Sequence, residues 1–290
     1  MELTQFDDAQ AFLDETESAL EQNEALNGLI LGVARRIRDG ERPPPADGSE
    51  SAPPLLLAAE RHSHLVLAAL QTPPQKMVLY CTPEHCDAAL DVLLTGLLEM
   101  EHALPGVIGP DPMPLRFSEA WTRQSGQTYR STMSTRVYEL REVRYSGATP
   151  GRLRVADEGD LDLLVEWMLC FNRDVGMHSH PMDVLRPQVT QRIARQGLYI
   201  WEDGGQPMSV AGPSRPTAHG MTINAVYTPP ELRDRGYSTA CVAALSQLML
   251  DTGKEFCTLF ADKTNPTSNS IYQRIGYDPV GSFTEYAFAD

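Results

Sequence analysis

A turn near the C-terminus combines the residue types that hold a phosphate group. It joins a predicted strand to a predicted helix of residues 238–251, and it reads Arg233-Asp234-Arg235-Gly236-Tyr237-Ser238. The first backbone N–H groups of a helix have no partner within it, and the helix dipole places partial positive charge there. Gly236 allows close approach of a ligand, and the two arginines add positive charge. The turn therefore predicts an anion site, although taken alone the pattern also fits an ordinary turn before a helix.

The next predicted helix carries a polar stripe that includes a tyrosine. Asn265 is a favoured N-cap, and Pro266 is a favoured first helical residue. One helical face then presents Asn265, Ser268 or Asn269, Tyr272 and Gly276. A phenol on such a face can donate a proton to a leaving group, whereas a half-buried core tyrosine is the alternative. Because the anion turn lies just upstream, the two segments together favour one site for binding and proton transfer.

The elements that position these residues alternate between strands and helices, which indicates an α/β (α+β) fold with a mixed sheet. Apolar alternation and turn residues predict strands at residues 55–59, 65–70, 76–81, 129–143, 152–156, 197–201, 207–211, 221–227, 256–261 and 282–288. Helical spacing predicts helices at residues 84–102, 117–123, 161–171, 184–195, 238–251 and 266–275, with one or two more in the first 38 residues. Residues 105–114 are expected to form a proline-rich turn.

The chain divides into two halves. Its 290 residues are about twice the usual length of one domain. A turn-rich segment at residues 143–153 separates two sets of elements with a similar order. We therefore expect two domains, residues 1–145 and 151–290. Residues 39–54 are rich in Pro, Gly, Ser and acidic residues, and we expect a mobile loop there.

On these motifs, residues 151–290 resemble the GNAT superfamily of acetyl-CoA-dependent N-acetyltransferases. Arg233-x-x-Gly236-x-Ser238 stands in the place of the family's Q/R-x-x-G-x-G/A pyrophosphate loop, with Ser238 as a small departure from Gly or Ala. The second matching segment is Asn265-x-x-Ser268-x-x-x-Tyr272-x-x-x-Gly276-Tyr277. The first half looks like a degenerate second copy, because the turn after residues 76–81 has no glycine and nothing matches the Asn–Tyr stripe. The resemblance thus implies two tandem GNAT-like domains, of which only the second binds coenzyme.

The resemblance also implies an acyltransferase that uses acetyl-CoA as co-substrate and no metal. A primary amine of a small molecule or peptide would attack the thioester directly, with Tyr272 as the general acid for the departing thiolate. Backbone groups of Ala225, Val226 and Tyr227 would contact the pantetheine arm, and Asn265 and Ser268 would contact the coenzyme. The pyrophosphate would lie on backbone amides of the turn, namely Arg233, Asp234, Arg235, Gly236, Tyr237 and Ser238. A coenzyme-binding but catalytically silent interaction module is the alternative, and transfer of another acyl group stays open.

No residue is uniquely marked as the base that deprotonates the amine. Glu202, His219 and Asn224 (through a water) are candidates by position. In the family, the loop between the first two helices of the domain borders the acceptor site, and here that loop contains His178 and His180; an exposed loop is the alternative for them. Three further residues are candidates either for the acceptor pocket or for the core, namely Met177, Met182 and Trp201.

Composition limits the partners. Thirty-nine acidic residues against 24 basic ones give a formal net charge of −15, which argues against nucleic acid and anionic membranes and suits a cationic amine. No apolar stretch approaches the ~18 residues of a membrane span, and the N-terminus lacks the pattern of a signal peptide. Cys81 and Cys86 flank His85, but no second ligand pair follows at zinc spacing. Three of the five cysteines lie in apolar runs, where a free thiol behaves as a small hydrophobe. We expect no metal, a cytoplasmic and reducing location, and a monomer or homodimer.

Overall fold

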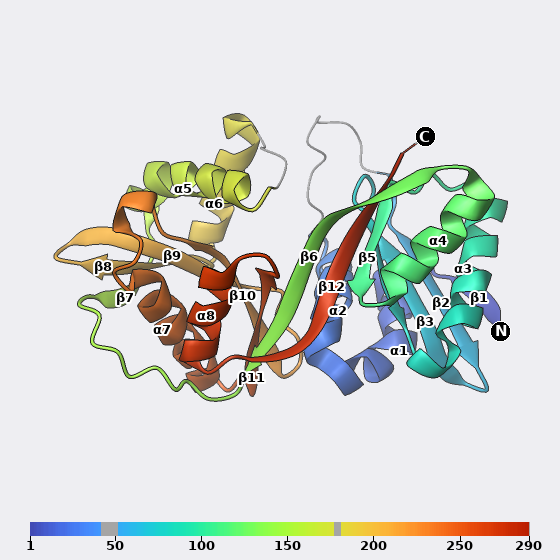
Figure 1. Ribbon diagram of the computed structural model, residues 1–290, viewed down its shortest axis with the longest axis horizontal. Helices are drawn as coiled ribbons and strands as arrows, with labels where there is room; N and C mark the ends of the chain where they lie inside the picture. The colour runs from blue at the N-terminus through green and yellow to red at the C-terminus, as the bar shows by residue number, and fades with distance from the viewer. Residues whose placement is uncertain (42–51, 177–180, 290) are drawn as a thin grey trace. The chain divides into compact units, whose positions relative to one another are not determined.

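The chain forms two α/β units (Figure 1). The computed structural model describes residues 1–41, 52–176 and 181–289, so most of the predicted loop at residues 39–54 lies outside the described residues. One unit contains Met1–Val137 and Val280–Asp290, and the other contains Tyr138–Pro279.

The same succession of ten strands and helices occurs twice. The first set is β1 (Glu2–Gln5), α1 (Ala9–Leu20), α2 (Glu24–Arg38), β2 (Leu55–Arg61), β3 (His64–Gln71), β4 (Met77–Cys81), α3 (Cys86–Glu99), β5 (Gly106–Pro110), α4 (Met113–Ser125) and β6 (Thr128–Leu140). The second set is β7 (Arg152–Val155), α5 (Leu161–Asp174), α6 (Met182–Ala194), β8 (Tyr199–Asp203), β9 (Gln206–Ser214), β10 (Gly220–Tyr227), α7 (Tyr237–Asp251), β11 (Phe256–Asp262), α8 (Pro266–Ile275) and β12 (Asp278–Ala289).

Strand pairing repeats as well. In the first set β1, β2, β3 and β4 pair antiparallel in order, and β4 pairs parallel with β5. In the second set β7, β8, β9 and β10 pair antiparallel in order, and β10 pairs parallel with β11. The expected α/β fold with a mixed sheet is confirmed.

The closing strands do not stay with their own sets. Phe283–Ala287 of β12 pairs with β5, and Phe288 packs into the first unit with its ring 5.9 Å from that of Trp121. The end of β6 belongs to the second unit, where Tyr138 and Leu140 are buried in the core. The first unit therefore includes most of β12, and the second unit includes only the last residues of β6.

In both units helices cover the two faces of the sheet (Figure 1). Leu55, Leu57 and Ala59 of β2 pack with α3 and α4, whereas Leu56 and Ala58 pack with α1 and α2. Both faces of the strand are thus buried, which explains its continuous apolar sequence.

The second unit follows the same rule. Ile200 of β8 packs with α5 and α6, and the neighbouring Trp201 packs with α7 and α8. The helices α7 and α8 therefore lie on one face of their sheet, beside β11.

The expected turn at residues 105–114 is wrong in part, because it contains strand β5. Its glycine and proline residues are typical of turns, yet Val107 is buried and pairs with Met77 of β4. Gly109 is required by close packing, since a Cβ there would lie 2.8 Å from the carbonyl oxygen of Leu79.

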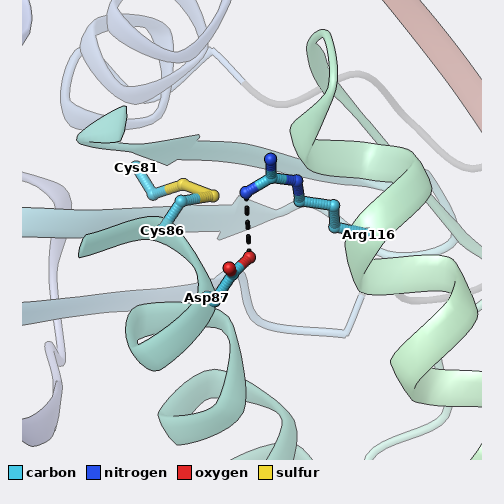
Figure 2. Close-up of a disulfide and its surroundings, with 4 residues drawn as sticks. All are labelled: Cys81, Cys86, Asp87 and Arg116. Atoms are coloured by element: carbon cyan, nitrogen blue, oxygen red, sulfur yellow. Dashed lines mark hydrogen bonds and ion pairs between the residues drawn. A yellow bond between two sulfur atoms is a disulfide. The ribbon is translucent and has the colours of Figure 1, made fainter. Parts of the chain in front are cut away.

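A disulfide joins Cys81 and Cys86, which the sequence suggested only as a weak metal pair (Figure 2). It links the end of β4 to the first residue of α3, with the two Cα atoms 5.3 Å apart, and both residues are buried. An ion pair of 2.9 Å between Asp87 and Arg116 lies beside it. This bond removes one basis for the expected reducing location, since disulfides persist mainly in oxidising surroundings.

The described helices include none that is both long enough and apolar enough to cross a membrane.

The disulfide should contribute measurably to stability. Closing a loop of this length lowers the entropy of the unfolded chain and is worth about 2 kcal/mol. We therefore expect a reductant to lower the free energy of unfolding of the wild type by about that amount, as measured by urea denaturation. The double variant Cys81→Ala/Cys86→Ala should be insensitive to the reductant. Cys170→Ala, which removes a half-exposed free thiol, should respond like the wild type, and equal wild-type curves with and without reductant would contradict the prediction.

Candidate functional site

The candidate site begins where two parallel strands part. β10 pairs with β11 only from Gly220 to Thr222, opposite Phe256 to Thr258. Both strands then continue, β10 to Tyr227 and β11 to Asp262. The facing backbone groups of their second halves therefore have no partner in this ladder. The carboxyl ends of parallel strands lie at one edge of a sheet, where ligands commonly bind.

A bulge in β10 frees backbone groups at the same place. The register with β9 shifts between Asn224 and Tyr227, and Ala225 has a left-handed φ of 52°. This conformation costs a residue with a side chain about 1–2 kcal/mol, and such strain is concentrated at functional sites. Neither Ala225 nor Val226 is in register with a β9 residue, so both lie outside the regular ladder with β9.

Two buried hydroxyls hold the end of β10. The Ser209 hydroxyl donates to the carbonyl oxygen of Tyr227 at 3.0 Å and accepts from the Thr228 hydroxyl at 2.8 Å. Because both hydroxyls are buried, these bonds are shielded from water and keep the strand end in place.

The predicted anion turn lies directly after this strand end. Among the described residues, the six backbone amides from Asp234 to Thr239 donate no hydrogen bond. Gly236 is the N-cap of α7, with φ 82°, and a Cβ there would lie 2.8 Å from the Thr149 hydroxyl. Unpaired amides and the dipole of the 15-residue helix α7 make this turn suited to a phosphate group.

The arginines of the turn have different environments. The Arg233 guanidinium donates to the Thr228 carbonyl at 3.0 Å and to the Asp174 carboxylate at 2.7 Å, and it lies 5.9 Å from the ring centroid of Tyr227. Its charge is therefore largely balanced by Asp174, and its main role is to hold the turn. Arg235 is exposed.

Tyr237 anchors the first turn of α7. Its phenol donates to the Asp203 carboxylate at 2.9 Å, and this hydrogen bond raises the pKa of Tyr237. The side chain thus ties the helix to the end of β8, while the backbone amide remains free.

The residues of the polar stripe differ in their roles: Asn265 and Asn269 bond within the protein, whereas Ser268 is half-exposed. The Asn265 side chain caps α8 by accepting from the Ser268 amide at 3.0 Å, as expected. Asn269 is buried and donates to the carbonyl oxygens of Asp262 at 2.8 Å and Asn265 at 2.6 Å. Because its amide is fully engaged in structure, Ser268 rather than Asn269 is the half-exposed member of the stripe.

Tyr272 lies against two other tyrosines. It is 8% exposed, and its ring centroid is 6.2 Å from that of Tyr138 and 6.1 Å from that of Tyr277. Burial, with a smaller contribution from Tyr138, raises the pKa of Tyr272 to about 12. Its hydroxyl has no hydrogen-bond partner among the described residues. The phenol is therefore protonated at neutral pH.

Tyr138 is a residue that the sequence did not single out. Its phenol donates to the Asn269 carbonyl oxygen at 2.7 Å, and its side chain is fully buried. No local pattern in β6 marks it, since the partner lies 131 positions away in sequence.

The three candidates for the base differ in position. Hydrogen bonds from Arg154 and Arg152 lower the pKa of Glu202, which makes it a weaker base. His219 is exposed and precedes β10, at the opposite end of the strand from the bulge. Asn224 lies at the bulge, where its side-chain oxygen accepts from Arg192 at 3.0 Å. Only Asn224 is therefore next to the parted strands.

Residues considered for the acceptor pocket are scattered. Trp201 is 8% exposed and donates to the Pro150 carbonyl at 2.9 Å, so it belongs to the core. Met182 is 54% exposed at the start of α6. Met177, His178 and His180 lie outside the described residues. In the described part of the chain, no group of His, Cys, Asp or Glu is arranged to hold a metal ion.

The comparisons with known proteins agree with this geometry. Residues 211–286 match the family model described as FR47-like protein, and this range contains the bulge, the turn and α8. No curated protein matches the chain.

Solved structures match the chain over its whole length. A GNAT-family acetyltransferase from Colwellia psychrerythraea is 11% identical, with a TM-score of 0.61 and coverage of 100% of both chains. A Drosophila protein is 13% identical, with a TM-score of 0.67 and coverage of 99% of this chain and 98% of its own. A tandem GNAT protein from the clavulanic acid biosynthesis pathway is 13% identical, with a TM-score of 0.58 and coverage of 99% and 98%. The chain has the GNAT fold, so the expected resemblance is confirmed.

Gly236→Ala should destabilise the turn for two reasons. Alanine pays about 1–2 kcal/mol in the left-handed conformation, and its Cβ would also press on the Thr149 hydroxyl. Gly253→Ala, at the other end of α7, is the matched control, because its φ is also positive (95°) but nothing lies within 4 Å of the added Cβ. Gly236→Ala should lower the free energy of unfolding by at least about 1 kcal/mol more than Gly253→Ala. Thr149→Ala should recover that difference; equal losses in the two glycine variants would contradict the clash.

The Tyr272 phenol should make stability fall at alkaline pH. Its pKa is raised in the folded protein to about 12 from an ordinary value of 10.0, so its contribution is present below pH 10 and is lost as pH rises to 12. Between pH 10 and 12, the free energy of unfolding should fall by roughly 2–3 kcal/mol more in the wild type than in Tyr272→Phe. Urea denaturation at several pH values measures this. The difference between the two proteins should be constant from pH 7 to 9, and parallel curves above pH 10 would contradict the prediction.

Proposed function

We propose that this chain, which has the GNAT fold, is an acyltransferase that moves the acetyl group of acetyl-CoA to a primary amine. The observation that carries the proposal is the row of unpaired amides from Asp234 to Thr239, at the edge where β10 and β11 part. The coenzyme is a polyanion, and this row offers it donors in a chain whose net charge is −15.

The described residues fit the coenzyme along its length. The pyrophosphate would accept hydrogen bonds from the amides of the turn, with Arg235 nearby. The pantetheine arm would extend between the parted strands and bond to backbone groups of Ala225, Val226 and Tyr227. Asn265 and Ser268 would line the same edge from the start of α8.

The chemistry requires an attacking amine and a departing thiolate. The amine nitrogen forms a bond to the thioester carbonyl carbon, the carbon–sulfur bond breaks, and the sulfur takes the electron pair. Tyr272 would donate its proton to that sulfur, and the ammonium proton would leave to water held near Asn224. A proton from solvent would then restore the Tyr272 phenol, so that one amide and one free thiol are the net products.

Burial fits the phenol for this donation. A group with a pKa of about 12 is a weak acid toward an ordinary thiolate. Burial nevertheless raises the pKa of Cys241 and of Cys257, two thiols in the same core, to about 12 as well. Burial likewise raises the pKa of a thiol, so a coenzyme thiolate that forms away from water would be a stronger base toward the Tyr272 phenol.

We propose that the first unit binds no coenzyme. The turn after β4 uses its amides internally: the Thr82 amide donates to Val66 at 3.0 Å, and the His85 amide donates to Thr82 at 3.2 Å. The disulfide between Cys81 and Cys86 also links the end of β4 to the start of α3. The second unit has the proposed anion turn at the equivalent position, between β10 and α7. One coenzyme per chain is the expected stoichiometry.

The acceptor is proposed to be a small-molecule or peptide amine, and the acidic surface favours a cationic one. A cytoplasmic location and a monomeric or homodimeric state stay predictions.

Acetyl-CoA should bind and Tyr272 should then speed its reaction. At about 100 times its Kd, acetyl-CoA should add about 2.7 kcal/mol to the free energy of unfolding. Tyr272→Phe should keep this shift and lower kcat by roughly 10² to 10⁴, as followed by thiol release with a panel of polyamines, aminoglycosides, amino acids and peptides. Tyr129→Phe, which removes an exposed phenol, is the control.

The outcomes separate the alternatives. Binding without thiol release for any amine would indicate a silent coenzyme-binding module, and an absent shift would exclude coenzyme binding. Unchanged turnover in Tyr272→Phe would remove Tyr272 as the acid.

A further inference from the structure

We infer that Tyr138, which comes from the last strand of the N-terminal half, is a positioning residue for the Tyr272 phenol. This inference rests on the proposed function, since it assigns Tyr138 a task at the same site. Tyr138 lies in β6, outside the segment that contains the coenzyme motifs, yet it is part of the second unit.

The first contact that carries the inference is a hydrogen bond to the helix that bears Tyr272. The Tyr138 phenol donates to the Asn269 carbonyl oxygen at 2.7 Å. The Asn269 amide nitrogen donates in turn to Asp262, the last residue of β11, and to Asn265, the cap of α8. Asn269 therefore joins three elements, and Tyr138 supplies the bond that its oxygen needs.

This bond acts close to the reacting group. Asn269 precedes Tyr272 by three residues in α8, so the two side chains lie on one face of the helix. Rotation or withdrawal of the helix start would displace the Tyr272 phenol directly.

The second contact is between the rings. The centroids of Tyr138 and Tyr272 are 6.2 Å apart, with the planes at 57°. Since no described residue bonds to the Tyr272 hydroxyl, ring packing is what orients it. Tyr138 provides one wall of that packing and Tyr277 provides another.

The inference gives the N-terminal half a part in the reaction. Residues 151–290 contain every motif residue, but they do not contain Tyr138. The strand β6 brings this side chain into the second core with a fully buried ring and a paired hydroxyl. The half without a coenzyme turn would thus complete the site of the other.

A purely structural role makes a different prediction. Removing the hydroxyl would then lower stability and leave catalysis by the folded protein unchanged. A positioning role requires a fall in kcat with unchanged coenzyme affinity, and it requires that the effect pass through Tyr272.

Tyr138→Phe in the full chain tests the inference, and Tyr277→Phe is the matched control. Tyr277 is also buried, its hydroxyl is 2.8 Å from that of Ser246, and its ring also contacts Tyr272. Tyr138→Phe should lower kcat at least tenfold, since small misplacements of a reacting group cost up to about 10². The Kd of acetyl-CoA, from isothermal titration, should stay within about twofold. Tyr277→Phe keeps the ring that packs against Tyr272 and loses only the hydroxyl beside Ser246, so it should lower the melting temperature without lowering kcat.

The double variant Tyr138→Phe/Tyr272→Phe shows whether the effect passes through Tyr272. It should turn over no more slowly than Tyr272→Phe alone, because residues that act as a unit are not additive. Additive losses, or equal losses of kcat in Tyr138→Phe and Tyr277→Phe, would overturn the inference.

A phenolate titration keeps the test separate from the proposed function. If Tyr272→Phe turned over like the wild type, or if no amine were acetylated, the proposed function would fail. The ionisation of Tyr272 would then be followed by the absorbance of phenolate as pH is raised. For each protein, the titration of the same protein with the added change Tyr272→Phe would be subtracted. Because Tyr138 contributes to the raised pKa of Tyr272, contact between the two phenols predicts a lower midpoint in Tyr138→Phe than in the wild type or Tyr277→Phe, and an unchanged midpoint would overturn the inference.

Discussion

The parting of β10 and β11 is the constraint on which the rest of the site depends. The two strands pair over three residues and then diverge, so the backbone groups that follow lack their usual partners. The bulge at Ala225 removes further groups from the ladder with β9. Recognition by such groups does not depend on charged side chains, and Arg233 of the turn is already paired with Asp174. By our proposal, this arrangement would let a chain of negative net charge bind a polyanion.

The divergence also positions the side of the site that we propose for catalysis. β10 leads through the turn into α7, and β11 leads through Asn265 into α8, so both helices begin at one edge of the sheet. What holds α8 there is the engaged amide of Asn269, and Tyr138 completes that network from β6. The end of β6 is therefore linked to the proposed site, because it places Tyr138 in the second unit.

Much of the fold followed from local patterns, and the failures have physical causes. Continuous apolar runs identified β2, β3 and β4, and helical spacing identified α3, α7 and α8. β5 was mistaken for a turn because Gly106 and Gly109 are turn residues by local rules, whereas their purpose is close packing against neighbouring backbone. Glu202 was considered as a base, but its arginine partners lie 48 and 50 positions away in sequence and could not be read locally.

The sequence by itself determined the parts whose interactions span a few residues. The cap at Asn265 and the left-handed Gly236 before α7 bond or turn within their own segments, so residue type and spacing suffice to predict them. Only the tertiary structure decided which distant residues meet. The bond of Cys81 and the place of Tyr138 against Asn269 depend on strand pairing and on closure of long loops, whose outcome is set by packing of the whole chain. A local sequence pattern does not encode that outcome. The contact of Tyr138 with Asn269 could therefore be identified only from the tertiary structure.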